Sequence, residues 1–96
     1  MNRESIFQQL KAYREQNYLK YGIEEIGVFG SVARGQEKSD SDIDIFIKTK
    51  TPNPFIIVHV KEELETILNT SVDIVRLHNN MNTQLKQYID REGISV

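Results

Sequence analysis

The sequence predicts a small α/β (α+β) domain, in which a mixed β-sheet of three to four strands packs with about four helices. Short runs rich in β-branched residues, bounded by glycine or polar residues, alternate with longer segments whose apolar residues recur every three or four positions. The chain has 96 residues, which suits one domain. Because no linker, internal repeat or low-complexity tract divides it, residues 1–96 are expected to form a single domain.

The composition excludes several classes of protein. The absence of cysteine rules out a disulfide framework and a thiolate zinc site. With 12 basic and 14 acidic residues, the chain lacks the basic excess typical of nucleic-acid-binding domains, so nucleic acid is not expected as a direct partner. No segment approaches the roughly 18 apolar residues needed to cross a bilayer, and the polar N-terminus does not resemble a signal peptide. We therefore expect a cytoplasmic protein with no membrane association.

Residues 3–21 are predicted to form one amphipathic helix. Apolar side chains recur at helical spacing, at Ile6, Phe7, Leu10, Tyr13, Tyr18 and Tyr21. The charged residues expected to point outward are Arg3, Lys11 and Glu15. Gly22 is a suitable C-terminal stop, because glycine readily adopts the left-handed conformation that ends many helices.

A strand over residues 25–29 is expected to end in a glycine-serine turn. The run is short, apolar and bounded by glycines. Ser31 is predicted to cap a short helical turn through Arg34, closed by Gly35, so that backbone N–H groups face whatever lies above the strand. Such a turn suits a phosphate, but taken alone it fits an ordinary tight turn equally well.

Two aspartates follow on a second predicted strand. The sequence from Asp42 to Ile47 alternates strictly after a polar loop over residues 36–41, and side chains of a strand alternate between its two faces. The isoleucines therefore share one face, whereas Asp42 and Asp44 share the other. Adjacent carboxylates repel each other unless a cation neutralises them, so this pattern indicates a metal site. Asp40 lies outside the alternation and is interpreted as a loop or capping residue.

The segment 55–60 fits two structures. Its β-branched residues favour a strand. Apolar residues nevertheless recur at helical spacing beyond it, and Pro54 suits the first position of a helix. We favour a helix over residues 55–69, following a loop over residues 48–54.

The C-terminal part is predicted to contain a strand, a helix and a short edge strand. Residues 71–77 form an apolar run interrupted by Asp73, which indicates a strand. Asparagines precede a helix over residues 83–92 whose inward side chains would be Leu85, Tyr88 and Ile89. Residues 94–96 are expected to add the edge strand.

Other motifs with a similar outline fail at particular positions. A Walker site would need lysine and a hydroxyl residue where Gln36 and Glu37 stand. A dinucleotide fingerprint would need a glycine in the place occupied by Ala33 or Arg34. A calcium loop would need glycine at Ile45 and glutamate at position 51. His59 and His78 have no partner at metal-ligand spacing and are interpreted as structural or surface residues.

The combined pattern resembles the signature of the DNA polymerase beta-like nucleotidyltransferase superfamily. That signature is Gly30-Ser31, ten intervening residues, then Asp42-Ile43-Asp44, with Asp73 matching the third carboxylate. The fuller strings from Gly30 to Gly35 and from Ser41 to Asp44 are most similar to the minimal nucleotidyltransferases (MNT) of prokaryotes. Members of that group are the antitoxins paired with small helical HEPN ribonuclease toxins. The resemblance covers nearly all of the chain.

The resemblance implies a nucleotidyltransferase fold and a specific reaction, the transfer of AMP from ATP to a tyrosine hydroxyl of the HEPN toxin. Asp42, Asp44 and Asp73 would be the catalytic residues that hold two Mg²⁺ ions. Gly30 and Ser31 would bind the phosphates, and Arg34 either joins them or is a surface arginine. Two alternatives remain open: an antitoxin that neutralises its toxin by binding alone, and a nucleotidyltransferase acting on a small molecule.

Overall fold

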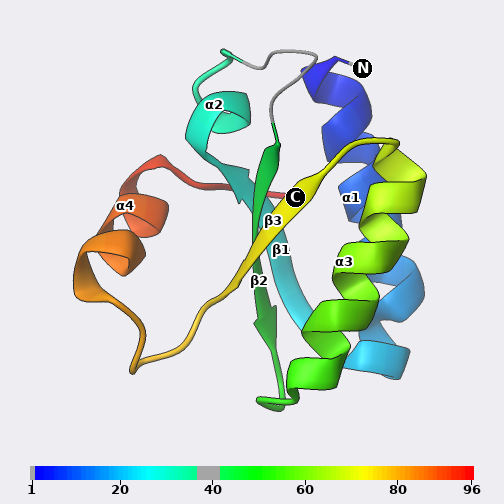
Figure 1. Ribbon diagram of the computed structural model, residues 1–96, viewed down its shortest axis with the longest axis vertical. Coiled ribbons are helices and arrows are strands. Elements are labelled where there is room, and N and C mark those ends of the chain that lie inside the picture. The colour runs from blue at the N-terminus through cyan, green and yellow to red at the C-terminus, as the bar shows by residue number, and fades with distance from the viewer. Residues whose placement is uncertain (1, 37–41) are drawn as a thin grey trace.

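The computed structural model of the chain describes residues 2–36 and 42–96, and within them helices lie on both faces of a four-stranded sheet (Figure 1). The elements are α1 (Arg3–Tyr21), β1 (Ile23–Phe29), α2 (Gly30–Ala33), β2 (Ile43–Thr49), α3 (Pro54–Leu68), β3 (Val72–Arg76), α4 (Thr83–Glu92) and β4 (Ile94–Ser95). The strand order is β3-β2-β1-β4. Strand β1 is antiparallel to β2 and β4, whereas β2 and β3 are parallel. The predicted mixed sheet and α/β class are therefore confirmed.

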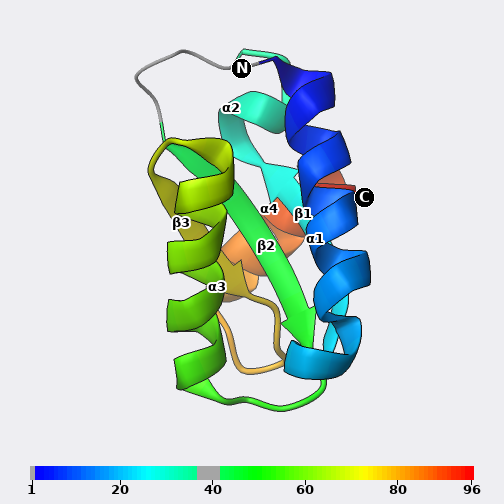
Figure 2. The same ribbon diagram turned by 90° about the vertical axis from the view of Figure 1, so that its right-hand side faces the viewer.

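Two different cores cover the two faces of the sheet. Helices α1 and α3 lie side by side on the face that carries the isoleucines of β2, Ile43, Ile45 and Ile47 (Figure 2). Helix α4 covers the opposite face, where Phe46 packs with Phe29 and Ile89. The face that carries Asp44 near the start of β2 therefore becomes apolar at Phe46, which continues the alternation.

Segment 55–60 is helical, as favoured. Helix α3 begins at Pro54, as expected for a proline at the first helical position. Asn53 is the N-cap residue, and its side chain accepts a hydrogen bond from the Phe55 N–H at 2.9 Å. Val60 is fully buried, whereas Phe55 and Val58 are exposed. Only one side of this β-branched run contacts the core, as expected for a helix and not for a central strand. Asn69, in the left-handed conformation, ends the helix.

Several boundaries differ from the predictions. Strand β1 begins at Ile23, two residues earlier than expected, and β2 extends to Thr49, so the predicted loop over residues 48–54 starts too early. Both extensions arise from the pairing of Ile23 with Thr49, which no local pattern reveals. The predicted loop over residues 36–41 lies outside the described residues except for Gln36.

The outward position predicted for Arg3 is wrong. Its side chain is half-buried, and its guanidinium lies 5.3 Å from the centre of the Phe7 ring. Its Nη2 donates a hydrogen bond to the Ala33 carbonyl oxygen at 2.8 Å. Arg3 therefore connects the start of α1 to the end of α2, where the carbonyl groups of a helix attract positive charge.

Glu63 joins α1 to α3 through two tyrosines. The Tyr13 hydroxyl donates to Glu63 Oε1 at 2.7 Å, and the Tyr21 hydroxyl donates to Glu63 Oε2 at 2.8 Å. The Tyr13 hydrogen bond lowers the pKa of Glu63, and burial only partly opposes it. Two of the predicted core tyrosines are thus buried with their hydroxyls paired, whereas Tyr18 is partly exposed.

We expect the Glu63→Gln substitution to lower the unfolding free energy at pH 7 by about 1 kcal/mol, because hydrogen bonds to a charged acceptor are the stronger ones. Since the folded-state pKa is lowered, ionised Glu63 stabilises the fold above the ordinary value of 4.5, and this stabilisation disappears as the pH falls through the folded-state pKa. The difference in unfolding free energy between wild type and variant should therefore shrink on acidification. Denaturant unfolding at several pH values measures it, and Glu62→Gln, at the exposed neighbouring position, is the control. A difference independent of pH would contradict this role.

Candidate functional site

The glycine-serine turn lies directly against a carboxylate of the neighbouring strand. Phe29, the last residue of β1, pairs with Asp44 of β2, and Gly30 begins α2 with φ +69°. A Cβ at position 30 would overlap Asp44 Oδ2, so the residue needs both the left-handed backbone and the missing side chain of glycine. The turn is closed by a hydrogen bond from the Gln36 N–H to the Ser31 carbonyl oxygen at 2.7 Å.

Ser31 does not cap the short helix, contrary to the prediction. Helix α2 begins one residue earlier, at Gly30, and its N-cap is Phe29, which provides no side-chain hydrogen bond. The partly buried Ser31 is thus inside the helix. Among the described residues, its side chain makes no hydrogen bond, and the phosphate-binding role expected for it stays a prediction.

Two of the three predicted carboxylates, Asp44 and Asp73, lie on the neighbouring strands β2 and β3, and the third, Asp42, lies just before β2. Asp44 lies opposite Asp73 in the parallel register, and both alternate with residues of the α1–α3 core. Asp42 directly precedes β2 and is exposed, as is Asp73, whereas Asp44 is half-buried. Burial raises the pKa of Asp44, and the negative charges of Asp73 and then Asp42 raise it further. The structure therefore places Asp73 and Asp42 within electrostatic reach of Asp44.

Arg34 supplies positive charge near Asp44. Its side chain is exposed, and its charge lowers the pKa of Asp44, opposing the effect of the other aspartates. Its Nε donates to Gln36 Oε1 at 3.2 Å, and its Nη1 donates to the Tyr88 hydroxyl. From the sequence, Tyr88 is expected only to point inward from the last helix. No signal in the sequence could connect it to Arg34, because 54 positions separate them.

The carboxylates of Asp42, Asp44 and Asp73 fit a hard cation by their chemistry. Within residues 2–36 and 42–96, no three His, Cys, Asp or Glu side chains are arranged to hold a metal ion. The donors at Asp42, Asp44 and Asp73 are nevertheless the oxygens that Mg²⁺ prefers. Burial is the main cause of the raised pKa of Asp44, and repulsion from Asp73 and Asp42 adds to it. A cation bound there would remove that repulsion.

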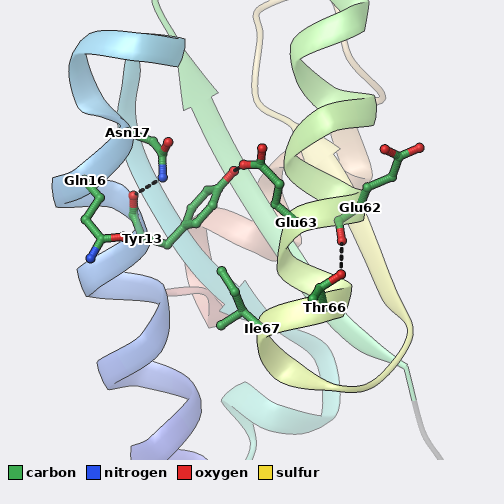
Figure 3. Close-up of a pocket in the computed structure, with 7 residues that line it drawn as sticks. All are labelled: Tyr13, Gln16, Asn17, Glu62, Glu63, Thr66 and Ile67. Carbon is green, nitrogen blue, oxygen red and sulfur yellow. Dashed lines mark hydrogen bonds between the residues drawn. The ribbon is translucent and has the colours of Figure 1, made fainter.

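A pocket of about 440 Å³ lies elsewhere, between α1 and α3 (Figure 3). Its lining includes Tyr13 and Glu63, whose hydrogen bond crosses from one helix to the other, together with Asn17, Thr66 and Ile67. Helices α1 and α3 cover the sheet face opposite to that of Asp44 and Asp73. This pocket is therefore separate from the carboxylate site.

No helix among the described residues is long and apolar enough to span a membrane.

Comparison with known proteins identifies the family. Residues 8–96 match the family described as polymerase beta, nucleotidyltransferase. Protein adenylyltransferase MntA of Thermococcus cleftensis is 33% identical over 94 residues, which are 97% of this chain and 94% of that protein. A solved structure provisionally described as a minimal nucleotidyltransferase is 32% identical, with a TM-score of 0.76 over 98% of this chain and 95% of the other.

The same fold occurs in a toxin–antitoxin complex. A chain in the structure of tri-AMPylated Shewanella oneidensis HEPN toxin with MNT antitoxin superimposes with a TM-score of 0.72, covering 97% of this chain and 70% of that chain. The identity is 21%, so this likeness concerns the fold. From the family match and the relatives together, the chain belongs to the polymerase beta nucleotidyltransferase family, among its minimal nucleotidyltransferases. Its enzyme class is accordingly nucleotidyltransferase.

Proposed function

We propose that this protein is the antitoxin of a HEPN toxin and that it transfers AMP from ATP to a tyrosine hydroxyl of that toxin. The observation that carries the proposal is the placement of Gly30 against Asp44, which in turn lies opposite Asp73. In this proposal the turn would bind the phosphates and the neighbouring carboxylates would bind the metal ions. The names of the MntA relative and of the toxin–antitoxin complex support the choice of AMP and of the partner.

The site would act mainly by positioning and electrostatics. When bound by Asp42, Asp44 and Asp73, two Mg²⁺ ions would stabilise the attacking and leaving oxygens of the transfer. Gly30 lets the turn lie directly against Asp44, and Ser31 would donate its hydroxyl and N–H group to a phosphate oxygen. Arg34 contributes a positive charge close to Asp44, where it would meet the phosphates.

The acceptor hydroxyl would approach from the β3 side. Strand β3 is an edge of the sheet and Asp73 is exposed on it, so a tyrosine of another protein can reach this carboxylate (Figure 1). In the reaction, the hydroxyl oxygen would form a bond to the α-phosphorus of ATP while the bond to pyrophosphate breaks. Asp73 would accept the proton that the hydroxyl loses.

Incubation with the product of the neighbouring gene, labelled ATP and Mg²⁺ tests the proposal. We expect the toxin to gain the mass of at least one AMP, located on a tyrosine by peptide mass spectrometry. The double variant Asp42→Asn with Asp44→Asn should bind the toxin but transfer nothing. An unmodified toxin in the presence of the folded wild-type protein would contradict AMP transfer. Full neutralisation by the double variant in cells would instead favour inhibition by binding alone.

A further inference from the structure

Tyr88 is held in place by the residue that leads into the glycine-serine turn. Its ring meets the Phe29 ring edge-on, with the ring centres 6.3 Å apart and an interplanar angle of 78°. Phe29 is buried and pairs with Asp44, and the neighbouring Ile89 anchors α4 in the same apolar cluster. Packing therefore fixes the Tyr88 ring relative to the carboxylate site, independently of its hydroxyl.

The Tyr88 hydroxyl accepts a hydrogen bond from Arg34, which lies on the other side of the turn. An exposed arginine usually samples many side-chain conformations, and fixing it in one of them costs conformational entropy. Here the Nη1 contact with Tyr88 and the Nε contact with Gln36 select one conformation. In that conformation the guanidinium acts electrostatically on Asp44.

We propose that Tyr88 is a positioning residue, whose hydroxyl holds the Arg34 guanidinium where the phosphates of the nucleotide bind. A guanidinium has five N–H donors, and among the described residues the contacts with Gln36 and Tyr88 engage two of them, which leaves three. Those donors suit a triphosphate, because arginine binds phosphate oxygens with charge-assisted hydrogen bonds. The inference rests on the proposed function in requiring a bound nucleotide, and it assigns Arg34 to phosphate binding and not to the surface role left open by the sequence.

Direct binding of ATP in the presence of Mg²⁺, measured by isothermal titration calorimetry, tests this role without requiring transfer. The Tyr88→Phe substitution removes the hydroxyl and keeps the ring on Phe29. We expect it to weaken ATP binding about three- to tenfold, the range of one hydrogen bond. Arg34→Ala should weaken binding at least as much, and the double variant should bind no more weakly than Arg34→Ala alone. Tyr18→Phe, which removes a hydroxyl at the far end of α1, should leave the affinity unchanged.

Three readouts separate positioning from a merely structural role. Tyr88→Phe should keep the wild-type melting temperature while the KM for ATP rises more than kcat falls. The inference is overturned if Tyr88→Phe binds ATP as tightly as wild type, or if the effects of the two substitutions simply add in the double variant. It is also overturned if only the melting temperature changes. If the wild type itself fails to bind ATP, the proposed function fails with it, whereas ATP binding without toxin modification would count against the proposed function alone.

Discussion

Asp44→Asn should abolish AMP transfer and at the same time make the nucleotide-free protein more stable. Asp44 is the half-buried member of the three carboxylates, and burial together with Asp73 and Asp42 disfavours its ionised form. Asparagine has nearly the same shape but carries no charge, so it removes this repulsion. It also removes a strong ligand for Mg²⁺. We expect the rate of transfer to fall by roughly 100- to 1,000-fold, because the transition state loses several kcal/mol of stabilisation.

The stability half of this prediction has a definite dependence on pH. Because the folded-state pKa of Asp44 is raised above its ordinary value of 3.8, the folded protein binds protons more readily than the unfolded chain in that range. The unfolding free energy of wild type therefore falls as the pH rises from 3.8 through the folded-state value. This decrease should be missing in the variant. In a domain of this size, 1 kcal/mol shifts the melting temperature by about 4–8 °C, so a small effect is measurable.

Thermal unfolding in the presence of a metal chelator, together with labelled transfer to the toxin, measures both effects. Asp90→Asn, which changes an exposed aspartate of α4, is the matched control and should alter neither. Lower stability of Asp44→Asn at pH 7 would show that Asp44 makes a favourable contact that outweighs the repulsion. Transfer at the wild-type rate would exclude Asp44 from catalysis.

The sequence predicts this fold well wherever a local pattern determines the structure. Strict alternation identifies β2, and Pro54 with helical spacing identifies α3. The short edge strand β4 is confirmed as well. Each of these elements follows from the order of apolar and polar residues along a few turns or a few strand positions.

What escapes the sequence depends on contacts between distant segments. The extension of β1 to Ile23 arises from its pairing with Thr49, and the half-buried position of Arg3 arises from its hydrogen bond to Ala33. The same holds for the site. Alternation along the strand predicts which face carries Asp42 and Asp44. The position of Asp73 opposite Asp44 is set by the register of the parallel strands β2 and β3. No local pattern reveals this register, because it depends on the packing of the whole sheet.

Gly30→Ala should impair both folding and catalysis more than the corresponding change at Gly35. Both glycines have nearly the same left-handed backbone, with φ +69° and +71°. Alanine is strained in this region by about 1–2 kcal/mol, so each substitution should lower the unfolding free energy by a similar amount for this reason. At position 30, the new Cβ would also overlap Asp44 Oδ2, whereas at position 35 its nearest neighbour is Arg3 Nη1 at 3.9 Å.

The comparison of these two variants therefore isolates the contact between the turn and the carboxylate. Because the overlap pushes the Asp44 side chain away from the turn, Gly30→Ala should lose transfer activity by at least about 100-fold, since misplacing a reacting group by about 1 Å can cost that much. Gly35→Ala should keep most of its activity after correction for the folded fraction. Urea unfolding and single-turnover transfer measure the two effects separately. Equal activity in the two variants would mean that Asp44 can move away from Gly30 without consequence, and the close approach would then have no role in catalysis.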